Sequence, residues 1–284
     1  MPARVQRAGG GRFADVRRVA STGSTNTDLV ALARAGAPEG VVLVADHQTA
    51  GRGRLDRRWE APPGSSLLVS VLCRPALPPA RAHLVTVVAG LAALDALEQV
   101  AGTRPALKWP NDVVVELPDG TRKLAGVLAE SVLAGGALSA VVVGMGMNVR
   151  RPAGATDGPS QEVRAAATSV SALAGREVSV DDVLVAWLGA LGERYEELVA
   201  GGGVAATQAA HRQDCATLGR RVAVQLAGET VEGEAVDVDD DGHLVVERDG
   251  VRQAFAVGDV VHLRPAAGAA PRPRPGGSAD RADG

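Results

Sequence analysis

Apolar and polar positions alternate along most of the chain in two patterns, one with the period of a helix and one typical of strands. The stretch 82–100 carries apolar side chains at a helical spacing and predicts an amphipathic helix. Hairpins with interspersed helices favour an α+β fold, in which a mixed, largely antiparallel sheet carries helices on one face. Runs rich in β-branched and aliphatic residues predict its strands at 13–20, 41–45, 66–72, 106–109, 113–116, 123–133 and 137–144.

Further helices are expected at 169–173 and 180–199, and a last short one ends at Cys215. Another begins near residues 24–26, where Ser, Thr and Asn are all good N-cap types and apolar residues follow at a helical spacing. Read alone, these three polar residues are simply a helix cap. A loop is expected at 152–161.

The pattern changes at Gly219, after which short strands recur at a spacing of about ten residues, separated by turns rich in Gly and Asp. This pattern predicts a small SH3-like β-barrel. Its strands are expected at 221–226, 230–238, 243–248, 251–256 and 260–263. The chain therefore divides into a large domain at 13–216 and a barrel domain at 217–265. The tails at 1–12 and 266–284 have low-complexity compositions and are expected to be disordered.

Composition narrows the class of protein without identifying it. Of the 284 residues, 46% are hydrophobic and 22% charged, which is typical of a globular protein with one large domain and one small one. The net charge of −3 gives no reason to expect attraction to nucleic acid or membranes. Cys73 and Cys215 show neither metal-ligand spacing nor a disulfide framework. With no signal peptide and no apolar run of about 18 residues, a cytoplasmic protein is expected.

The segment 45–59, which reads ADHQTAGRGRLDRRW, carries the most distinctive chemistry. It follows a predicted strand, and its glycines allow a tight turn that exposes backbone N–H groups. Its four arginines supply fork-shaped cationic donors suited to phosphate and carboxylate. Such a loop should be mobile when empty and should close on an anion. Taken alone, it is equally compatible with a solvated basic turn.

Four other blocks accompany this loop: STNT at 24–27, KWPND at 108–112, KLAGVL at 123–128 and GMGMNV at 144–149. The sequence offers no Ser–His–Asp or Cys–His arrangement with triad logic and no Walker A loop. Together the blocks resemble the biotin–protein ligases, also called biotin–[acetyl-CoA carboxylase] ligases, over about residues 21–149 and more weakly to about 264. About twenty residues precede STNT, so the resemblance is to the form without an N-terminal DNA-binding domain, and no DNA partner is expected.

The resemblance implies a class II synthetase-like biotin/lipoate ligase catalytic domain followed by an SH3-like C-terminal domain. It implies an enzyme that uses ATP to activate biotin as biotinyl-5′-AMP, releases pyrophosphate, and then forms a C–N bond to a lysine of a biotin carboxyl carrier protein or domain. ATP and biotin would be substrates, and Mg²⁺ the cofactor. Family members occur as monomers and as ligand-linked homodimers, and both are open for this chain.

The resemblance also implies roles for individual residues. Lys123, Arg52 and Arg54 would be catalytic, because the lysine reaches the ligand carboxylate and α-phosphate and the arginines close over these anions. The biotin-binding residues would be Ser24, Thr25, Asn26, Gln48, Gly51, Arg52, Arg54, Lys123 and Gly126. The ATP-binding residues would be Arg54, Arg57, Trp59 (packed on adenine), Lys108, Asn111, Asp112 (also a Mg²⁺ ligand), Lys123 and Asn148. An apolar wall would come from Val127, Met145 and Met147.

One position departs from the family pattern, since Asp56 stands where many relatives have a further glycine. It places a negative charge in the arginine loop, where it could pair with Arg57 or Arg58. The nearest alternative function is a lipoate–protein or octanoate–protein ligase, which shares the fold and the adenylate chemistry. A non-catalytic biotin-binding regulator is a third interpretation, and Lys123 and the arginine loop argue against it.

Overall fold

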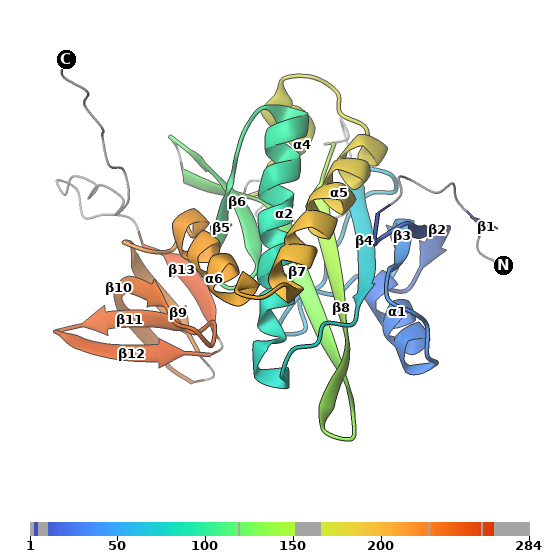
Figure 1. Ribbon diagram of the computed structural model, residues 1–284. Coiled ribbons are helices and arrows are strands. Elements are labelled where there is room, and N and C mark those ends of the chain that lie inside the picture. The colour runs from blue at the N-terminus through green and yellow to red at the C-terminus, as the bar shows by residue number, and fades with distance from the viewer. Residues whose placement is uncertain are drawn as a thin grey trace, which may run out of the picture.

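The computed structural model describes residues 11–118, 120–150, 166–226, 228–256 and 258–263, together with the backbone of residues 3–4. It shows an eight-stranded sheet layered with helices, beside a five-stranded sheet built by the C-terminal part of the chain (Figure 1). The loop expected at 152–161, the tail expected at 266–284 and most of the tail expected at 1–12 lie outside the described residues.

The large sheet is mixed and mostly antiparallel, as the sequence predicts. Its strands are β1 (Ala3–Arg4), β2 (Asp15–Thr22), β3 (Val41–Gln48), β4 (Ser66–Cys73), β5 (Ala106–Lys108), β6 (Asp112–Leu117), β7 (Gly120–Ala134) and β8 (Ala137–Asn148). Their spatial order is β1-β2-β3-β4-β8-β7-β6-β5. The pairing of β2 with β3 is parallel, and the other neighbouring pairs are antiparallel.

Helices cover the two faces of this sheet unequally. The helices α2 (His83–Ala101, preceded by the short 3₁₀ helix η1, Pro79–Arg81), α4 (Val170–Ala174), α5 (Val180–Val199) and α6 (Gly203–Asp214) form a layer on one face. The prediction of helices on one face holds for these four, but α1 (Thr25–Arg34) packs on the other. Strand alternation shows the difference, because Val71 belongs to the core under α2 whereas its neighbour Leu72 packs with Leu29 of α1.

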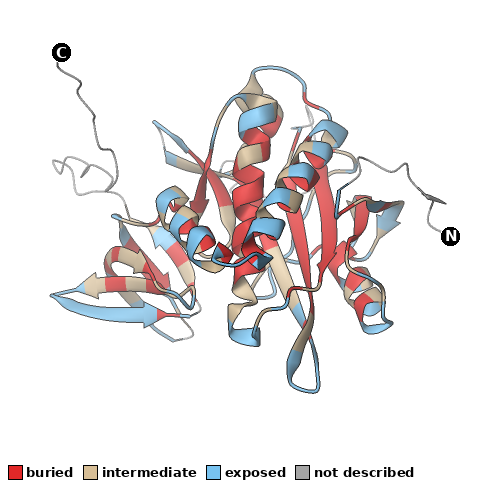
Figure 2. Cartoon of the chain, viewed as in Figure 1, coloured by how far each residue is buried: buried red, intermediate tan, exposed pale blue. Residues whose placement is uncertain are grey.

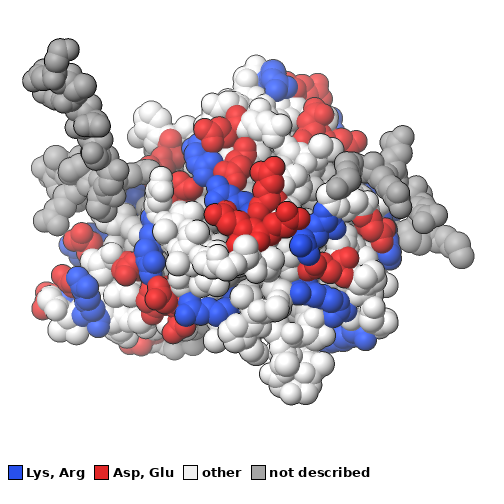
Figure 3. Space-filling view, viewed as in Figure 1, with Lys and Arg blue, Asp and Glu red and all other residues white. Residues whose placement is uncertain are grey.

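The centre of the main core is α2, which is buried on most of its circumference rather than on a single stripe (Figure 2). The sheet lies against one side of α2 and α5 against another, and these contacts account for its apolar composition. The segment Pro79–Ala101 is long and apolar enough to cross a membrane by length and composition, and 67% of its most apolar window is buried inside the molecule. The exposed surface of the helix layer carries interspersed acidic and basic side chains (Figure 3).

All five strands predicted for the C-terminal part form. They are β9 (Arg221–Gln225), β10 (Thr230–Val238), β11 (Leu244–Arg248), β12 (Val251–Phe255) and β13 (Asp259–His262). They pair in the antiparallel order β12-β11-β10-β9-β13. Their apolar side chains enclose a separate core that includes Val224, Leu244 and Phe255.

Trp109 joins the two sheets. It lies in the KWPND segment between β5 and β6, yet its side chain is 3% exposed and belongs to the core of the C-terminal sheet. Its indole Nε1 donates a hydrogen bond to the carbonyl of Gly242 at 2.9 Å, and its backbone N–H donates to Oγ1 of Thr217 at 3.0 Å. Arg212 of α6 adds bonds to the carboxylates of Asp237 and Asp240. The C-terminal sheet is therefore anchored to the KWPND segment itself.

Replacement of Trp109 by Ala is expected to lower the free energy of unfolding by about 3–5 kcal/mol, because it removes a large buried ring and leaves a cavity in the second core. Urea unfolding followed by circular dichroism measures this change. Leu133→Ala is the control, since Leu133 is 56% exposed, and its effect should stay within about 0.5 kcal/mol. A loss of stability no larger than that of the control would show that Trp109 does not anchor the two sheets.

Candidate active site

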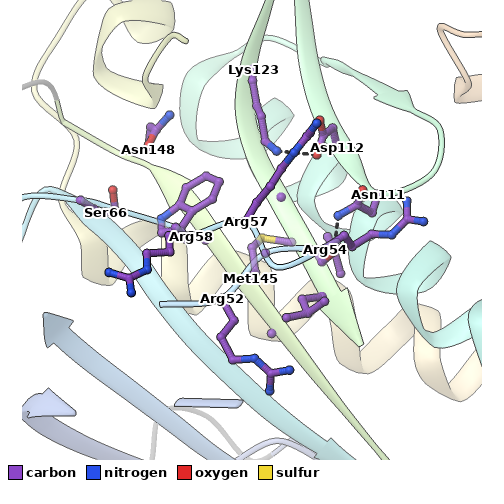
Figure 4. Close-up of a pocket in the computed structure, with 18 of the residues that line it drawn as sticks. Arg52, Arg54, Arg57, Arg58, Ser66, Asn111, Asp112, Lys123, Met145 and Asn148 are labelled. Atoms are coloured by element: carbon purple, nitrogen blue, oxygen red, sulfur yellow. Dashed lines mark hydrogen bonds and ion pairs between the residues drawn. The ribbon is translucent and has the colours of Figure 1, made fainter. Parts of the chain in front are cut away.

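A cavity of about 1050 Å³ opens on the face of the large sheet that lies opposite α2 (Figure 4). In β5 to β8 alternate apolar residues pack under α2, so the residues between them face the cavity. Cross-strand pairing aligns these in one row, in which Lys108 lies opposite Asp112, Asp112 opposite Gly126, and Gly126 opposite Gly146. The volume is slightly above the range of about 300–1,000 Å³ that is usual for ligand pockets.

Glycines in this floor let other side chains approach the sheet closely. A Cβ atom at Gly146 would lie 2.5 Å from Cε2 of Trp59, and one at Gly144 would collide with Oδ1 of Asn26. Trp59 therefore lies flat over Gly146 and beside Gly126, and its Nε1 is buried without a hydrogen-bond partner. The absence of side chains at 144 and 146 fixes where both Trp59 and Asn26 sit.

One end of the cavity is lined by Thr25, Asn26 and Gln48, which are connected to Ser70 and Glu130 outside the lining. These five side chains are here called the polar network. Oε1 of Gln48 accepts from the backbone N–H of Thr25 at 2.8 Å. Oγ of Ser70 lies 2.7 Å from Oγ1 of Thr25 and 2.6 Å from Oδ1 of Asn26. Nδ2 of Asn26 donates to the carbonyl of Leu128 and to Oε2 of Glu130, both at 3.1 Å. Buried polar groups held in this way present fixed donors and acceptors to a ligand.

The arginine loop folds as a hairpin over the cavity. The backbone N–H of Trp59 donates to the carbonyl of Gly51 at 3.0 Å, and that of Gly53 donates to the carbonyl of Arg57 at 2.7 Å. Leu55 and Asp56 form the tip, with φ values of 53° and 56°, and the N–H of Arg57 closes the turn onto the carbonyl of Arg54 at 3.1 Å. Positive φ at both central positions defines a type I′ turn, which favours Gly, Asn or Asp.

Two carboxylates hold the arginines of the loop. Arg52 pairs with Glu130 at 2.8 Å, and Arg57 pairs with Asp259 of the C-terminal sheet at 2.6 Å. Burial raises the pKa of Asp259, but the hydrogen bond from Arg57 together with the positive charges of Arg57, Lys108 and Lys123 outweighs that effect, so the net pKa is lowered. Of the two partners suggested for Asp56, Arg57 instead pairs with Asp259 and links the loop to the second sheet.

The other end of the cavity is cationic. Nζ of Lys123 lies 2.6 Å from Oδ1 of Asp112 and 5.6 Å from the centre of the Trp59 ring. Burial lowers the pKa of Lys108 and of Arg54, although the charge of Asp112 partly offsets this in both. Arg54, Arg57, Lys108 and Lys123, here called the cationic cluster, thus surround one carboxylate from each sheet. Such a cluster is suited to a ligand with several anionic oxygens.

The structure brings the residues predicted for the site together. All of them line the cavity except Gly51 and Met147. Gly51 is buried at the neck of the hairpin, where a Cβ atom would collide with the carbonyl of Trp59. Asn111, expected to contact nucleotide, donates its Nδ2 to the carbonyl of Val127 at 2.7 Å and fixes the KWPND segment to β7. Met147 is a correction, because it is fully buried in the core on the helix side and does not line the cavity.

Sequence reasoning missed Ser70, Glu130 and Asp259. Ser70 is buried within β4 and has apolar neighbours on both sides, and a polar residue inside such a run was a usable signal. Glu130 lies four residues after Gly126 on the same strand, so strand alternation places both on the cavity face. Asp259 lies about 136 residues beyond Lys123, and only the packing of the two sheets brings it to the loop.

A mixed sheet with a glycine floor, a cationic cluster and a small C-terminal β domain defines the class of protein as a ligase of the biotin and lipoate type. Family models agree, since residues 18–148 match the Biotin/lipoate A/B protein ligase family and residues 217–263 match the Biotin protein ligase C terminal domain. The chain is 40% identical over 256 residues to a biotin–[acetyl-CoA-carboxylase] ligase of Mycobacterium tuberculosis, which covers 87% of this chain and 88% of that one.

Two further comparisons agree. The Paracoccus denitrificans biotin–[acetyl-CoA-carboxylase] ligase is 33% identical, covering 85% of this chain and 98% of that protein. The solved structure of the Aquifex aeolicus biotin protein ligase in complex with biotin and ATP has a TM-score of 0.70 and 25% identity, covering 88% of this chain and 99% of that one. The chain belongs to the biotin protein ligase family.

Lys108→Met is expected to stabilise the fold at neutral pH. Because burial lowers the folded-state pKa of Lys108 below its ordinary value of 10.5, folding disfavours the protonated amine. That destabilisation is fully present below the folded-state pKa and disappears above the unfolded-state pKa. The gain in unfolding free energy of K108M over wild type, about 1 kcal/mol at pH 7, should therefore shrink as the pH rises toward 10.5.

Urea unfolding of both proteins at several pH values between 7 and 10.5 measures this difference. Lys→Met at a solvated position is not available as a control in the described residues, because the two lysines there both line the cavity. Arg248→Met, on the exposed end of β11, serves instead and should show no pH-dependent gain. A loss of stability in K108M at pH 7 would contradict the argument.

Proposed function

We propose that the protein activates biotin with ATP to form biotinyl-5′-AMP and pyrophosphate, and then transfers the biotinyl group to a lysine of a biotin carboxyl carrier protein or domain. The observation that carries this proposal is the layout of one cavity, in which a polar network and a cationic cluster face each other across a glycine floor. Biotin has a polar cyclic urea at one end and a carboxylate at the other. That layout matches its two ends.

The chemistry needs two anions brought into contact. A biotin carboxylate oxygen would attack the α-phosphorus of ATP, the bond from that phosphorus to the bridging oxygen would break, and pyrophosphate would leave. Lys123, which faces the cavity from β7, would neutralise charge on both reactants, and Arg54 and Lys108 would hold the phosphates. In the second step the neutral lysine amine of the carrier would attack the acyl carbon and AMP would leave. Catalysis is then by positioning and electrostatic stabilisation.

Mg²⁺ is compatible with the residues present as a partner of the phosphates. Among the described residues, no group of three or more His, Cys, Asp or Glu side chains could hold a metal ion by itself. Mg²⁺ commonly binds through one or two carboxylates plus substrate phosphates, and Asp112 supplies a carboxylate beside the cationic cluster. The ion would neutralise phosphate charge, and Asp112 would hold it once Lys123 turns toward the reacting oxygens.

The polar network favours biotin over lipoate or octanoate. Thr25, Asn26 and Gln48 line one end of the cavity with hydrogen-bonding groups. Thr25 and Asn26 are buried, and the buried Ser70 contacts both of them. The ring of lipoate and the tail of octanoate carry no hydrogen-bonding groups, so neither could bond to the polar groups that face this end of the cavity. Sites built to hydrogen-bond a ligand reject analogues that cannot bond by large factors. The names of the relatives, which include biotin–[acetyl-CoA-carboxylase] ligase, support a carboxylase carrier as the acceptor.

ATP–pyrophosphate exchange, with biotin and lipoate offered separately, tests the proposal. Exchange is expected with biotin alone, and Lys123→Ala should lower its rate by about 100-fold or more because a charge that stabilises the transition state is lost. Exchange with lipoate alone would keep the chemistry and overturn the substrate. Absence of exchange with either ligand, while labelled biotin still binds, would favour the non-catalytic regulator.

Arg54→Ala is expected to keep the fold but release the adenylate early. A charge-assisted hydrogen bond is worth about 1.5–3 kcal/mol, so its loss should accelerate dissociation of labelled biotinyl-5′-AMP by about 10- to 100-fold. Filter binding after a chase of unlabelled adenylate measures that rate. Arg248→Ala, on an exposed strand end, is the control and should retain the adenylate as wild type does. Equal retention by R54A and wild type would contradict a role in closure.

A further inference from the structure

Glu130 connects two parts of the cavity that are far apart in sequence. Its Oε1 accepts from Nη1 of Arg52 in the arginine loop at 2.8 Å, and its Oε2 accepts from Nδ2 of Asn26 at 3.1 Å. The side chain of Glu130 is 26% exposed and that of Arg52 is 50% exposed. One oxygen of the carboxylate thus binds the arginine loop, and the other binds the start of α1.

The polar network has a defined direction that ends at this carboxylate. The hydroxyl of Ser70 has one hydrogen, and its 2.6 Å contact with Oδ1 of Asn26 is a bond only if Ser70 donates there. The Thr25 hydroxyl likewise has one hydrogen, which can be donated to Oε1 of Gln48 at 3.0 Å or to Oγ of Ser70 at 2.7 Å, but not to both. Asn26, having accepted at Oδ1, donates from Nδ2 to Glu130. Because a carboxylate and a carbonyl only accept, Glu130 and the carbonyl of Leu128 together fix the orientation of the Asn26 amide, and this orientation fixes the direction of the Ser70 hydroxyl.

The same carboxylate stabilises one arrangement of the loop. Arg52 and Arg57 are held on opposite flanks of the hairpin, by Glu130 of β7 and by Asp259 of the C-terminal sheet. If the loop lifts, Glu130 loses its charged donor and keeps only the amide of Asn26 and solvent. Movement of the loop therefore changes the electrostatic surroundings of a residue that orients the polar network.

We propose that Glu130 is a positioning residue that couples the arginine loop to the ring-binding end of the cavity. It holds the loop folded over the cavity through Arg52, and it holds the amide of Asn26 in one orientation at the end that would receive a ligand ring. A ligand that engages the polar network then favours the folded loop, and the folded loop favours an ordered network. The ligand part of this inference rests on the proposed function, whereas the loop part does not.

Limited trypsin digestion of the ligand-free protein tests the loop part. The loop contains Arg52, Arg54, Arg57 and Arg58, so it is cut readily whenever it lifts from the sheet. In Glu130→Gln the amide can still accept from Asn26 but cannot form the ion pair, and cleavage within 52–58 should accelerate about three- to tenfold. Mass spectrometry of the fragments separates cuts in the loop from cuts elsewhere.

Glu247→Gln is the matched control, because Glu247 also lies on a strand and pairs with an arginine, Arg252, at 2.9 Å, but lies in the C-terminal sheet. In the Glu247→Gln variant, the arginine loop should be cut at the wild-type rate. Arg52→Ala should accelerate loop cleavage as Glu130→Gln does, and the double variant should add nothing, because both changes remove one interaction. Additive effects, or cleavage of the loop at the wild-type rate in E130Q, would overturn the proposal.

Two measurements separate positioning from general destabilisation and from the proposed function. Unfolding midpoints of E130Q and wild type should differ little, and faster cleavage at all sites in proportion to lost stability would overturn the proposal. In pyrophosphate exchange, E130Q should raise the KM for biotin several-fold more than the KM for ATP, and Glu130→Asp should restore part of the loss. If neither protein exchanges biotin while the loop still depends on Glu130, the proposed function fails and the loop inference stands.

Discussion

The site depends on one electrostatic constraint, the collection of cations on a half-buried face of a sheet. Arg54, Arg57, Lys108 and Lys123 all line the same cavity. Burial lowers the pKa of Lys108 and Arg54, which means that the fold holds these charges against their tendency to be solvated. Such an arrangement persists only where anionic groups offset the repulsion, and without ligand these groups are the carboxylates of Asp112 and Asp259.

The two carboxylates explain why the sheets must be held together. Asp112 comes from the large sheet, but Asp259 opens β13 of the C-terminal sheet and reaches Arg57 only because the two sheets pack against each other. Trp109 supplies much of that packing, and it is next to Lys108 in the chain. The same short segment therefore provides a cation of the site and the anchor of the element that helps to neutralise it. The five residues 108–112 thus contribute both charged groups of the site and the side chain that holds the two sheets together.

The sequence was enough to predict the elements of the large sheet along the chain and the strands of the C-terminal sheet. Runs of apolar residues and turns rich in Gly and Asp are local signals. The site residues drawn from the motifs converge on one cavity, apart from Gly51 at the hairpin neck and Met147 in the main core. It was harder to predict which face of the sheet each side chain points to. Met147 and Gly146 are neighbours on β8, and the face each presents depends on the register with β4 and β7.

Long-range pairings account for the other misses. Glu130 reaches Asn26 across 104 positions of sequence, and the partner of Arg57 lies 202 positions away. No local pattern encodes such a pair. The side of the sheet covered by α1 was also not predictable, since the amphipathic pattern shows that a helix has an apolar face but not which face of a sheet receives it.

Asp56 shows how a departure from a family motif can leave its structure intact. Where the resemblance leads one to expect glycine, the chain has an aspartate at φ 56°, the second of two left-handed positions in a type I′ turn. Glycine adopts this conformation without strain, and aspartate is among the few other residues that tolerate it. The backbone bonds from Gly53 to Arg57 and from Trp59 to Gly51 set the hairpin, and neither involves the side chain at 56. The strain falls instead on Leu55, which has φ 53° and is 63% exposed, so the tip of the loop gains no compensating burial. The position of the arginines is thus decided by the neck of the hairpin and by its ion pairs, while its tip is free to vary.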